Sequence, residues 1–326
     1  MEPLRIGVAG LGSAGLDLLE NELSGNPAVN VVAICESQSQ RLYPARQALN
    51  LRGYQDYHDL LDDKDVELIA IAAPPDVRPD LAVRAFDAGK HAVVLSPPAL
   101  ESWQYKRMMK AASAADRLLA CRIPALDCPA FIGLRDALRD EPVGDVFDVS
   151  HAILINPPDW NDLSWHGDPL KGAGILNTLA FEMMCRTVEL LPDEIQDAYG
   201  RAAGRRRSDD FGDWFWAAVR FRNGSRIILE GDIAAPIPRQ EWRVGGRAGE
   251  IEILKAQDGP WRSVLRYPGN ERALDLPDKP EDFWGRVADA VRDGAELPIR
   301  PERVHKAMRV LEALAQSQED DEPVRI

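Results

Sequence analysis

Residues 4–15 read LRIGVAGLGSAG. The first six residues are an apolar run, typical of a strand buried on both faces of a parallel sheet. The three glycines that follow have the spacing of a phosphate-binding loop between a strand and a helix: one permits a tight turn, one lets backbone approach a pyrophosphate, and one lets the helix pack closely. The stretch therefore predicts a dinucleotide site formed by Gly10, Leu11, Gly12, Ser13, Ala14 and Gly15.

A carboxylate stands where such a site needs one. Glu36 follows the strand-like run 29–35 (VNVVAIC) and lies 21 residues after Gly15. An acid at this place accepts hydrogen bonds from the adenosine ribose hydroxyls, and its charge repels a 2′-phosphate, so NAD is the favoured cofactor. Arg41 is close enough in sequence to weaken the preference for NAD, so NADP is the alternative cofactor. The alternative is that Glu36 is a surface acid in the turn CESQSQR.

Strand and helix patterns alternate through the first 122 residues. Further strands are expected at 66–72, 91–95 and 118–122, with helices at 79–89, where Gly89 ends the helix, and at 101–116. This alternation predicts a doubly wound, Rossmann-type parallel sheet with helices on both faces.

The pattern changes after residue 122. Long strand-like segments at 144–155, 214–233 and 241–254 have few helices between them, and RNGS at 222–225 is a hairpin signal. We expect helices at 174–191 and 301–317. The fold class is thus α/β: a Rossmann domain at 1–122, then an α+β substrate and oligomerisation domain at 123–326 with a large, mostly antiparallel sheet. Whether the last helix packs back near the first domain stays open.

The composition excludes several classes of protein. A chain of 326 residues with 45% hydrophobic and 28% charged residues is an ordinary globular protein of about two domains. Its net charge of −14 makes a nucleic-acid partner unfavourable. The four cysteines have no metal-ligand spacing, so no metal is expected. No apolar run is long enough to span a membrane, and a cytoplasmic location is expected.

Several longer blocks carry a resemblance. The chain resembles the glucose–fructose oxidoreductase and inositol dehydrogenase family, written Gfo/Idh/MocA, nearly from end to end. The blocks are 54–75 (YQDYHDLLDDKDVELIAIAAPP), 85–100 (AFDAGKHAVVLSPPAL), 171–191 (KGAGILNTLAFEMMCRTVELL), 220–225 (RFRNGS) and 287–317 (VADAVRDGAELPIRPERVHKAMRVLEALAQS). The resemblance implies hydride transfer between a nicotinamide cofactor and a sugar, cyclitol or related small molecule. It also implies a homo-oligomer, a dimer or tetramer, through the C-terminal sheet.

The chain departs from this family at the proton-transfer positions. The family's Glu-Lys-Pro falls on residues 96–98 (SPP), so Pro97 replaces the lysine. The helical Asp and His fall on Thr178 and Glu182, and a further Asp falls on Cys185. We still expect the 96–98 turn beside the nicotinamide, with a cis bond before Pro98. The cofactor set therefore also includes Ala73, Pro74, Ser96, Pro97 and Pro98.

Other residues could supply the missing proton. Glu182 shares a helix face with Thr178, and burial beside a cofactor would raise the pKa of its carboxyl group enough for acid catalysis. The alternative for Glu182 is an ion pair with Arg186, four residues on. The preceding loop, 156–172, adds two candidate catalytic residues and two aromatic residues that could stack on a substrate ring. The catalytic candidates are Glu182, His166 and Lys171, and the substrate-binding candidates are Trp160, Trp165 and Thr178.

Two functions are compatible with this pattern. The intact glycine loop and Glu36 favour an atypical NAD(P)-dependent oxidoreductase acting on a small molecule. The simultaneous loss of the Lys, Asp and His positions favours the alternative, a catalytically silent, dinucleotide-bound sensor or partner-binding protein.

Overall fold

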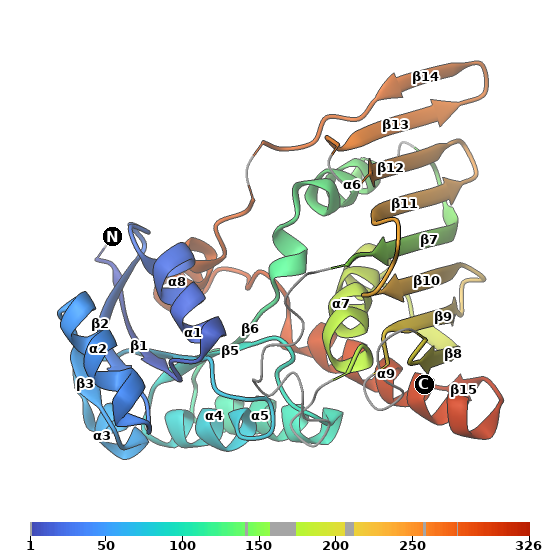
Figure 1. Ribbon diagram of the computed structural model, residues 1–326. Coiled ribbons are helices and arrows are strands. Elements are labelled where there is room, and N and C mark those ends of the chain that lie inside the picture. Colours follow the sequence, from blue (N-terminus) through green and yellow to red (C-terminus); the bar gives the residue numbers. More distant parts are fainter. Residues whose placement is uncertain (1, 141–142, 157–173, 206–211, 257–258, 279) are drawn as a thin grey trace. The chain divides into compact units, whose positions relative to one another are not determined.

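The computed structural model describes residues 2–140, 143–156, 174–205, 212–256, 259–278 and 280–326. The chain forms two compact units, each with its own sheet (Figure 1). The first unit contains Met1–Ile123 and Asp282–His305, and the second contains Pro124–Glu281 and Lys306–Ile326. The segment 282–305, which the linear division of the sequence assigns to the second domain, thus packs with the first unit.

The first unit is built on a six-stranded parallel sheet in the order β3-β2-β1-β4-β5-β6. Strand order reverses between β1 and β4, which is the switch point of a doubly wound fold. The predicted Rossmann-type sheet is therefore confirmed. Its strands are β1 (Leu4–Ala9), β2 (Val29–Cys35), β3 (Arg52–Tyr54), β4 (Leu68–Ile71), β5 (His91–Leu95) and β6 (Leu119–Arg122).

Helices cover both faces of this sheet. On one face, apolar residues of β1 and β2 form a core with the π-helix η1, α2 and α8. α4 and α5 pack against each other and against β5 and β6. The helical segments are α1 (Ser13–Asp17), η1 (Leu18–Leu23), α2 (Ser39–Leu49), α3 (Tyr57–Asp62), α4 (Arg78–Asp87), α5 (Ser102–Ala114) and α8 (Phe283–Asp293).

The second unit is built on a nine-stranded sheet in the order β14-β13-β12-β11-β7-β10-β9-β8-β15. The β7–β10 pair is parallel and the other pairs are antiparallel, so the predicted mostly antiparallel sheet is confirmed. Its strands are β7 (Val146–Leu154), β8 (Ile195–Ala203), β9 (Trp214–Phe221), β10 (Arg226–Asp232), β11 (Arg239–Gly246), β12 (Glu250–Ala256), β13 (Arg262–Tyr267), β14 (Asn270–Ala273) and β15 (Val324–Arg325).

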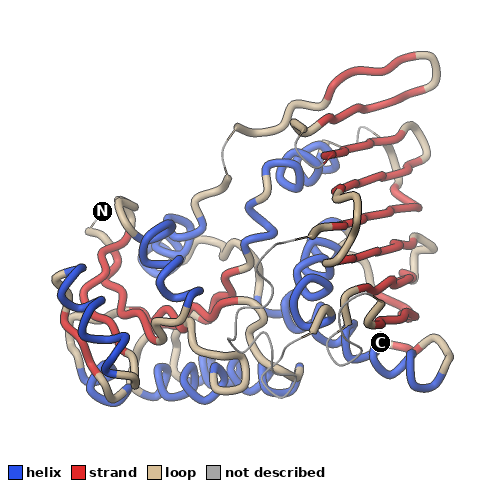
Figure 2. The backbone as a smooth tube through the Cα atoms, viewed as in Figure 1, coloured by secondary structure: helices blue, strands red, loops and turns tan. Residues whose placement is uncertain are grey.

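The predicted RNGS hairpin joins β9 to β10. Gly224 has φ +91°, and the Asn223 side chain accepts a hydrogen bond from the Ser225 N–H at 2.9 Å. Helices lie against one face of the sheet (Figure 2). The helical segments are η2 (Pro124–Asp127), α6 (Pro129–Arg139), the π-helix η5 (Leu176–Ala180), α7 (Phe181–Leu190) and α9 (Pro301–Asp320), whose first residues belong to the first unit.

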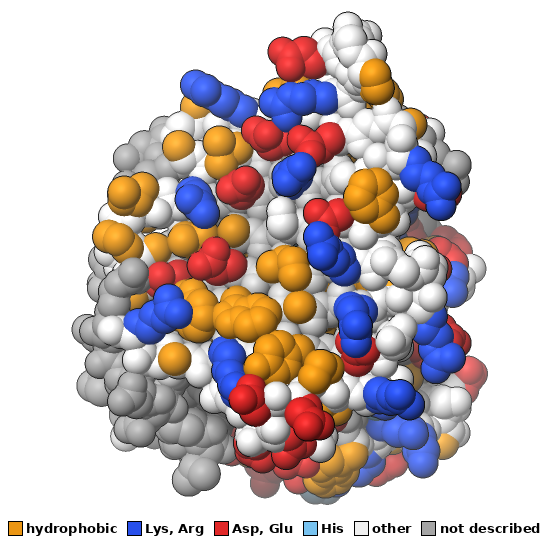
Figure 3. Space-filling view, turned by 90° about the vertical axis from the view of Figure 1, so that its right-hand side faces the viewer, with side chains coloured by type: hydrophobic (Ala, Val, Ile, Leu, Met, Phe, Trp, Pro, Cys, Tyr) orange, Lys and Arg blue, Asp and Glu red, His pale blue; other side chains and the backbone are white. Residues whose placement is uncertain are grey.

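The other face of this sheet carries mixed side chains. Figure 3 shows that side of the molecule, with hydrophobic side chains set among both acidic and basic ones. Tyr199 of β8 and Trp216 of β9 form an edge-to-face pair with ring centroids 5.7 Å apart, and Ile228 of β10 is 38% exposed. Ion pairs surround these residues: Arg220–Asp197, Arg226–Asp148, Arg243–Glu250 and Arg266–Glu252.

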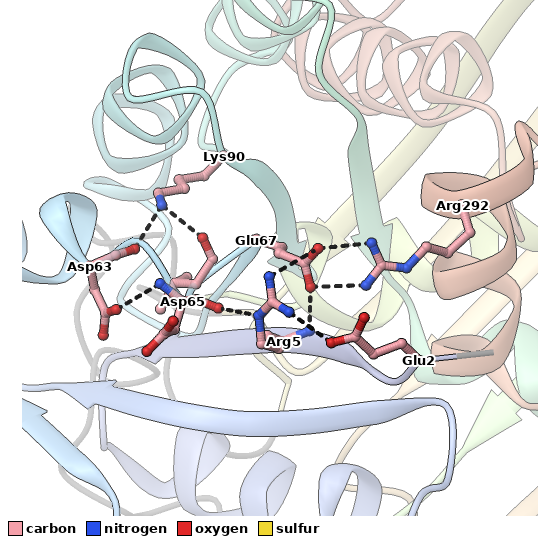
Figure 4. Close-up of polar contacts among 8 residues, drawn as sticks. Glu2, Arg5, Asp63, Asp65, Glu67, Lys90 and Arg292 are labelled. Atoms are coloured by element: carbon pink, nitrogen blue, oxygen red, sulfur yellow. Dashed lines mark hydrogen bonds and ion pairs between the residues drawn. The ribbon is translucent and has the colours of Figure 1, made fainter.

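An ion network fixes α8 to the first unit (Figure 4). Arg292 of α8 donates two hydrogen bonds to the Glu67 carboxylate, at 2.8 and 2.9 Å, and the Arg5 backbone N–H of β1 donates a third at 3.0 Å. Partial burial alone would raise the pKa of Glu67, but the bonds from Arg292 and Arg5 outweigh it and hold that pKa below its ordinary value. The late segment is therefore tied to the first strand by charge as well as by its apolar face.

Candidate functional site

The loop after β1 has room for a ligand at one glycine only. A Cβ at Gly10, whose φ is +96°, would lie 2.8 Å from the Ala73 backbone nitrogen, and one at Gly15 would lie 2.0 Å from the Gly10 carbonyl oxygen. Both positions therefore require glycine for the loop to form. A Cβ at Gly12 would meet only the Arg41 guanidinium, 4.0 Å away. The backbone at Gly12 is thus the part of the loop that a pyrophosphate can approach.

Glu36 lies at the edge of this loop rather than on an open surface. One carboxylate oxygen accepts the Leu11 N–H at 2.9 Å, and the other accepts the Gln38 N–H at 2.9 Å and the Ser37 hydroxyl at 3.2 Å. The side chain is only 8% exposed. These bonds fix the carboxylate beside the glycine loop, where a ribose hydroxyl could donate to it.

A groove of about 500 Å³ opens next to the loop. Its walls come from the start of α1 and from one face of α2, where Arg41 is exposed. The groove runs from the loop residues to the polar side chains of Gln40 and Arg41 on α2. It therefore offers space for an adenosine group. The lining residues are Leu11, Gly12, Ser13, Leu16, Gln40, Arg41, Pro44, Ala45 and Ala48. Together with the glycine loop and Glu36, these residues fit a dinucleotide.

The turn after β5 carries no side chain that titrates near neutral pH. Pro97 and Pro98 are buried, and Ser96 is half-buried with its N–H donating to the Arg122 carbonyl at 3.0 Å. The cis peptide bond precedes Pro97, so the expectation of a cis bond before Pro98 is wrong by one residue.

Two of the expected substrate-side residues lie on the helix of the second unit. The Thr178 hydroxyl of η5 donates to the Gly174 carbonyl at 2.9 Å, one turn earlier. Glu182, in the first turn of α7, is half-buried. His166, Lys171, Trp160 and Trp165 lie outside the described residues.

Arg186, the proposed ion-pair partner of Glu182, has other hydrogen bonds. Its guanidinium donates to the Ala125 carbonyl at 2.9 Å and to His151 Nε2 at 3.3 Å. Burial lowers the pKa of Arg186, and the Glu182 carboxylate is one of the nearby groups that partly offset this effect. Glu182 therefore acts on Arg186 as a nearby charge.

His151 completes a buried polar cluster beneath α7. Its Nδ1 lies 3.1 Å from the Glu241 carbonyl, and its ring stacks on Trp242 with centroids 3.4 Å apart. Burial, and next the Arg186 charge, lower the pKa of His151 well below its ordinary value. The ring is therefore neutral, with the proton on Nδ1 and Nε2 accepting from Arg186. Among the residues that the structure describes, no group of three or more His, Cys, Asp or Glu side chains could hold a metal ion.

Arg78 is a buried charged residue that sequence reasoning missed. It is 1% exposed and donates hydrogen bonds to a carbonyl after β4, to that of the last residue of β5, and to one in the turn that follows β5. An arginine before Pro79 at a helix start looks like a solvated charge, and only the packing of the two loops around it shows otherwise.

Comparison with known proteins agrees with this architecture. Residues 4–122 match the family model described as an oxidoreductase family with an NAD-binding Rossmann fold, GFO_IDH_MocA. Residues 4–122 therefore have the NAD-binding fold of the Gfo/Idh/MocA family. The chain is 34% identical to inositol 2-dehydrogenase of Salmonella paratyphi B over 110 residues, which is 33% of each protein. It thus spans about a third of the length of the inositol dehydrogenases that it matches.

Longer matches have lower identity. The chain is 25% identical to dTDP-3,4-didehydro-2,6-dideoxy-alpha-D-glucose 3-reductase of Streptomyces violaceoruber over 306 residues, covering 89% of this chain and 85% of the reductase. The WlbA dehydrogenase of Bordetella pertussis, solved with NADH and UDP-GlcNAcA, has the same fold, with a TM-score of 0.85, 18% identity and 99% coverage of both chains. In the part of the chain that the structure describes, no helix is long and apolar enough to cross a membrane.

Proposed function

We propose that the protein is a nicotinamide-dependent oxidoreductase that moves a hydride between its cofactor and a sugar, a cyclitol or a related carbonyl or alcohol. The observation that carries the proposal is the glycine loop, with its open approach at Gly12 and the Glu36 carboxylate fixed beside it. The match of residues 4–122 to the Gfo/Idh/MocA family model and the named sugar and cyclitol enzymes among the chain's relatives support the substrate class.

In this proposal the first unit binds the cofactor and the second binds the substrate. The loop N–H groups hold the pyrophosphate, Glu36 accepts the adenosine ribose hydroxyls, and the groove beside α2 takes the adenosine. NAD is preferred because a 2′-phosphate would lie next to the Glu36 carboxylate. Bound NAD supplies the hydride acceptor or donor. Arg41 leaves some binding of NADP.

The proton must come from the chain's own side chains or from water. Pro97 cannot donate one, and the Ser96 hydroxyl is a weak acid. Glu182 is our first candidate because it is an acid, half-buried, in the first turn of α7 on the helix face expected to meet the substrate. His166 and Lys171 are the next candidates, and Thr178, Trp160 and Trp165 are proposed substrate contacts.

We also propose a homo-oligomer, a dimer or tetramer, through the open face of the nine-stranded sheet. Exposed apolar side chains surrounded by ion pairs suit a contact between two copies of the same surface (Figure 3). The net charge of −14 favours a small-molecule substrate over a nucleic acid. A cytoplasmic location, where nicotinamide cofactors are abundant, belongs to the same proposal.

The proposal is tested by turnover. Purified full-length protein is mixed with NADH or NADPH and a panel of keto-sugars and dehydro-cyclitols, and with NAD or NADP and the corresponding alcohols, while absorbance at the reduced-cofactor band is followed. Turnover with at least one pair, reduced tenfold or more in Glu182→Gln, is expected. Cofactor binding without turnover anywhere in the panel would count against an oxidoreductase.

A further inference from the structure

The buried guanidinium of Arg78 lies where two loops at one edge of the parallel sheet meet. Its Nε donates to the Ala73 carbonyl at 2.6 Å, in the loop after β4. Its Nη1 donates to the carbonyl of Leu95, the last residue of β5, at 2.9 Å, and also to the Pro97 carbonyl in the turn that follows. One side chain therefore joins the loop after β4 to the 96–98 turn.

These two loops belong to the nicotinamide half of a doubly wound sheet. The strand order reverses between β1 and β4, and the glycine loop and Glu36 stand on the β1–β2 side. A dinucleotide that lies across the switch point with its adenosine on that side places its nicotinamide over β4 and β5. β4 and β5 are neighbours in register, with Ile71 opposite Val94, so their carboxyl ends share this edge.

The side chain that fixes these loops also carries a charge. Burial lowers the pKa of Arg78 to about 10, which leaves the guanidinium protonated at neutral pH. A charge inside the protein acts at longer range than one in water, because less solvent screens it. Cys121, and next the Asp76 carboxylate two residues before Arg78, partly offset this lowering of the pKa.

The two forms of a nicotinamide respond differently to a fixed positive charge, because the oxidised ring is a cation and the reduced ring is neutral. We propose that Arg78 is a positioning residue that holds the 96–98 turn in place and biases the bound cofactor toward its reduced form. This inference rests on the proposed function. The turn itself has no cationic side chain, and the charge is supplied instead by the buried Arg78, which bonds to the backbone of this turn.

The test compares affinities for NADH and NAD⁺, measured by calorimetry on the full-length protein. Wild type should bind NADH at least about tenfold more tightly than NAD⁺, the order of effect that one partly screened unit charge in a protein has on another. Arg78→Gln should reduce this preference about tenfold. Arg78→Lys, which keeps the charge, should weaken both affinities and change their ratio less than threefold. Asp76→Asn should move the ratio the other way, toward NADH.

Arg84→Gln is the matched control, because it removes one exposed positive charge from the same helix. It should leave the ratio unchanged. Circular dichroism checks folding. If Arg78→Gln does not fold, the ratios of NADH to NAD⁺ affinity in the wild type and in Asp76→Asn still test the inference. Equal binding of NADH and NAD⁺ by wild type, or an unchanged ratio in folded Arg78→Gln, would overturn this inference alone. Binding of neither form would overturn the proposed function and this inference with it.

Discussion

The three glycines of the loop after β1 have different surroundings, and the differences separate folding from binding. Gly10 and Gly15 are fixed by the protein itself, because a Cβ on either would meet backbone atoms at 2.8 and 2.0 Å. Gly12 has open space on the same side, with Arg41 Nη1 as its nearest neighbour at 4.0 Å. A requirement for glycine at that position would therefore come from a ligand.

Gly12→Ala is predicted to weaken NADH binding without changing stability. The added methyl group would occupy the approach to the pyrophosphate, and the loss of a hydrogen bond to a charged group reduces affinity about tenfold or more. Fluorescence titration with NADH and thermal unfolding measure the two effects. Gly15→Ala is the contrasting variant, expected to lose roughly 1–3 kcal/mol of stability along with binding. NADH binding by Gly12→Ala at wild-type affinity would contradict a close approach of the pyrophosphate.

Glu36→Gln is predicted to shift cofactor preference toward NADPH. The amide keeps an oxygen that can accept the Leu11 N–H, and it removes the charge that opposes a 2′-phosphate near Arg41. The ratio of NADPH to NADH affinity should rise about tenfold, consistent with a like-charge contact partly exposed to solvent. Asp87→Asn, at the far end of α4, removes an exposed charge and serves as the control. A wild-type protein that already prefers NADPH would be inconsistent with the role given to Glu36.

At the level of elements, α7 combines a half-buried acid in its first turn with a charged cluster beneath it. Arg186 and His151 are both buried, and the histidine accepts from the guanidinium because it is neutral. Such a cluster stabilises the fold only while His151 is neutral and Arg186 is protonated. The position of α7, and of Glu182 upon it, is thus linked to pH.

His151 is predicted to make stability fall with acid. Its folded pKa lies well below the unfolded value near 6.5, so below pH 6.5 the unfolded chain binds a proton that the folded chain does not. The free energy of unfolding should then fall by up to about 1.4 kcal/mol per pH unit from this group. Urea unfolding between pH 8 and pH 5 measures it. His151→Gln should flatten the slope, whereas His58→Gln, at an exposed position of α3, should not.

Elements with a strong local pattern were predictable from the sequence. β1 (Leu4–Ala9), β2 (Val29–Cys35) and β5 (His91–Leu95) lie where runs of apolar and β-branched residues place them. α6 and α8 were missed. α8 does have local signals, since the Asp282 side chain accepts from the Gly285 N–H and Gly294 ends the helix with φ +70°. Its place in the first unit has no local signal.

The features that could not be predicted from the sequence depend on tertiary contacts. Trp284 of α8 donates to Glu22 at 2.9 Å, a contact across 262 positions of sequence. The roles of Arg78 and Arg186 depend on which carbonyls surround them after folding. The glycine loop and Glu36 could be placed because both belong to one strand–helix–strand motif with fixed spacing. Buried arginines belong to no such motif, so only the structure identifies them.

For the whole molecule, each unit has a surface feature that its own helices and strands do not cover. In the first unit this feature is the groove beside the glycine loop, and in the second it is the open face of the sheet. On that face Tyr199, Trp216 and Ile228 come from three adjacent strands, in the order β10-β9-β8. A continuous group of apolar side chains on a sheet face is a common contact between identical subunits.

Ile228→Lys is predicted to dissociate the oligomer. The side chain is 38% exposed between the buried residues Ile227 and Leu229, so it points out of the sheet, and a lysine there would place two like charges near each other across a two-fold contact. Light scattering coupled to size-exclusion chromatography should show the wild type as a dimer or tetramer and the variant as a smaller species. Leu49→Lys makes the same change at a side chain of matched exposure, 40%, on α2, and should leave the mass unchanged. NADH affinity should be retained in Ile228→Lys because the proposed cofactor site belongs to the first unit. A wild-type protein that elutes as a monomer at micromolar concentration would rule out this use of the sheet face and leave the proposal for the cofactor site intact.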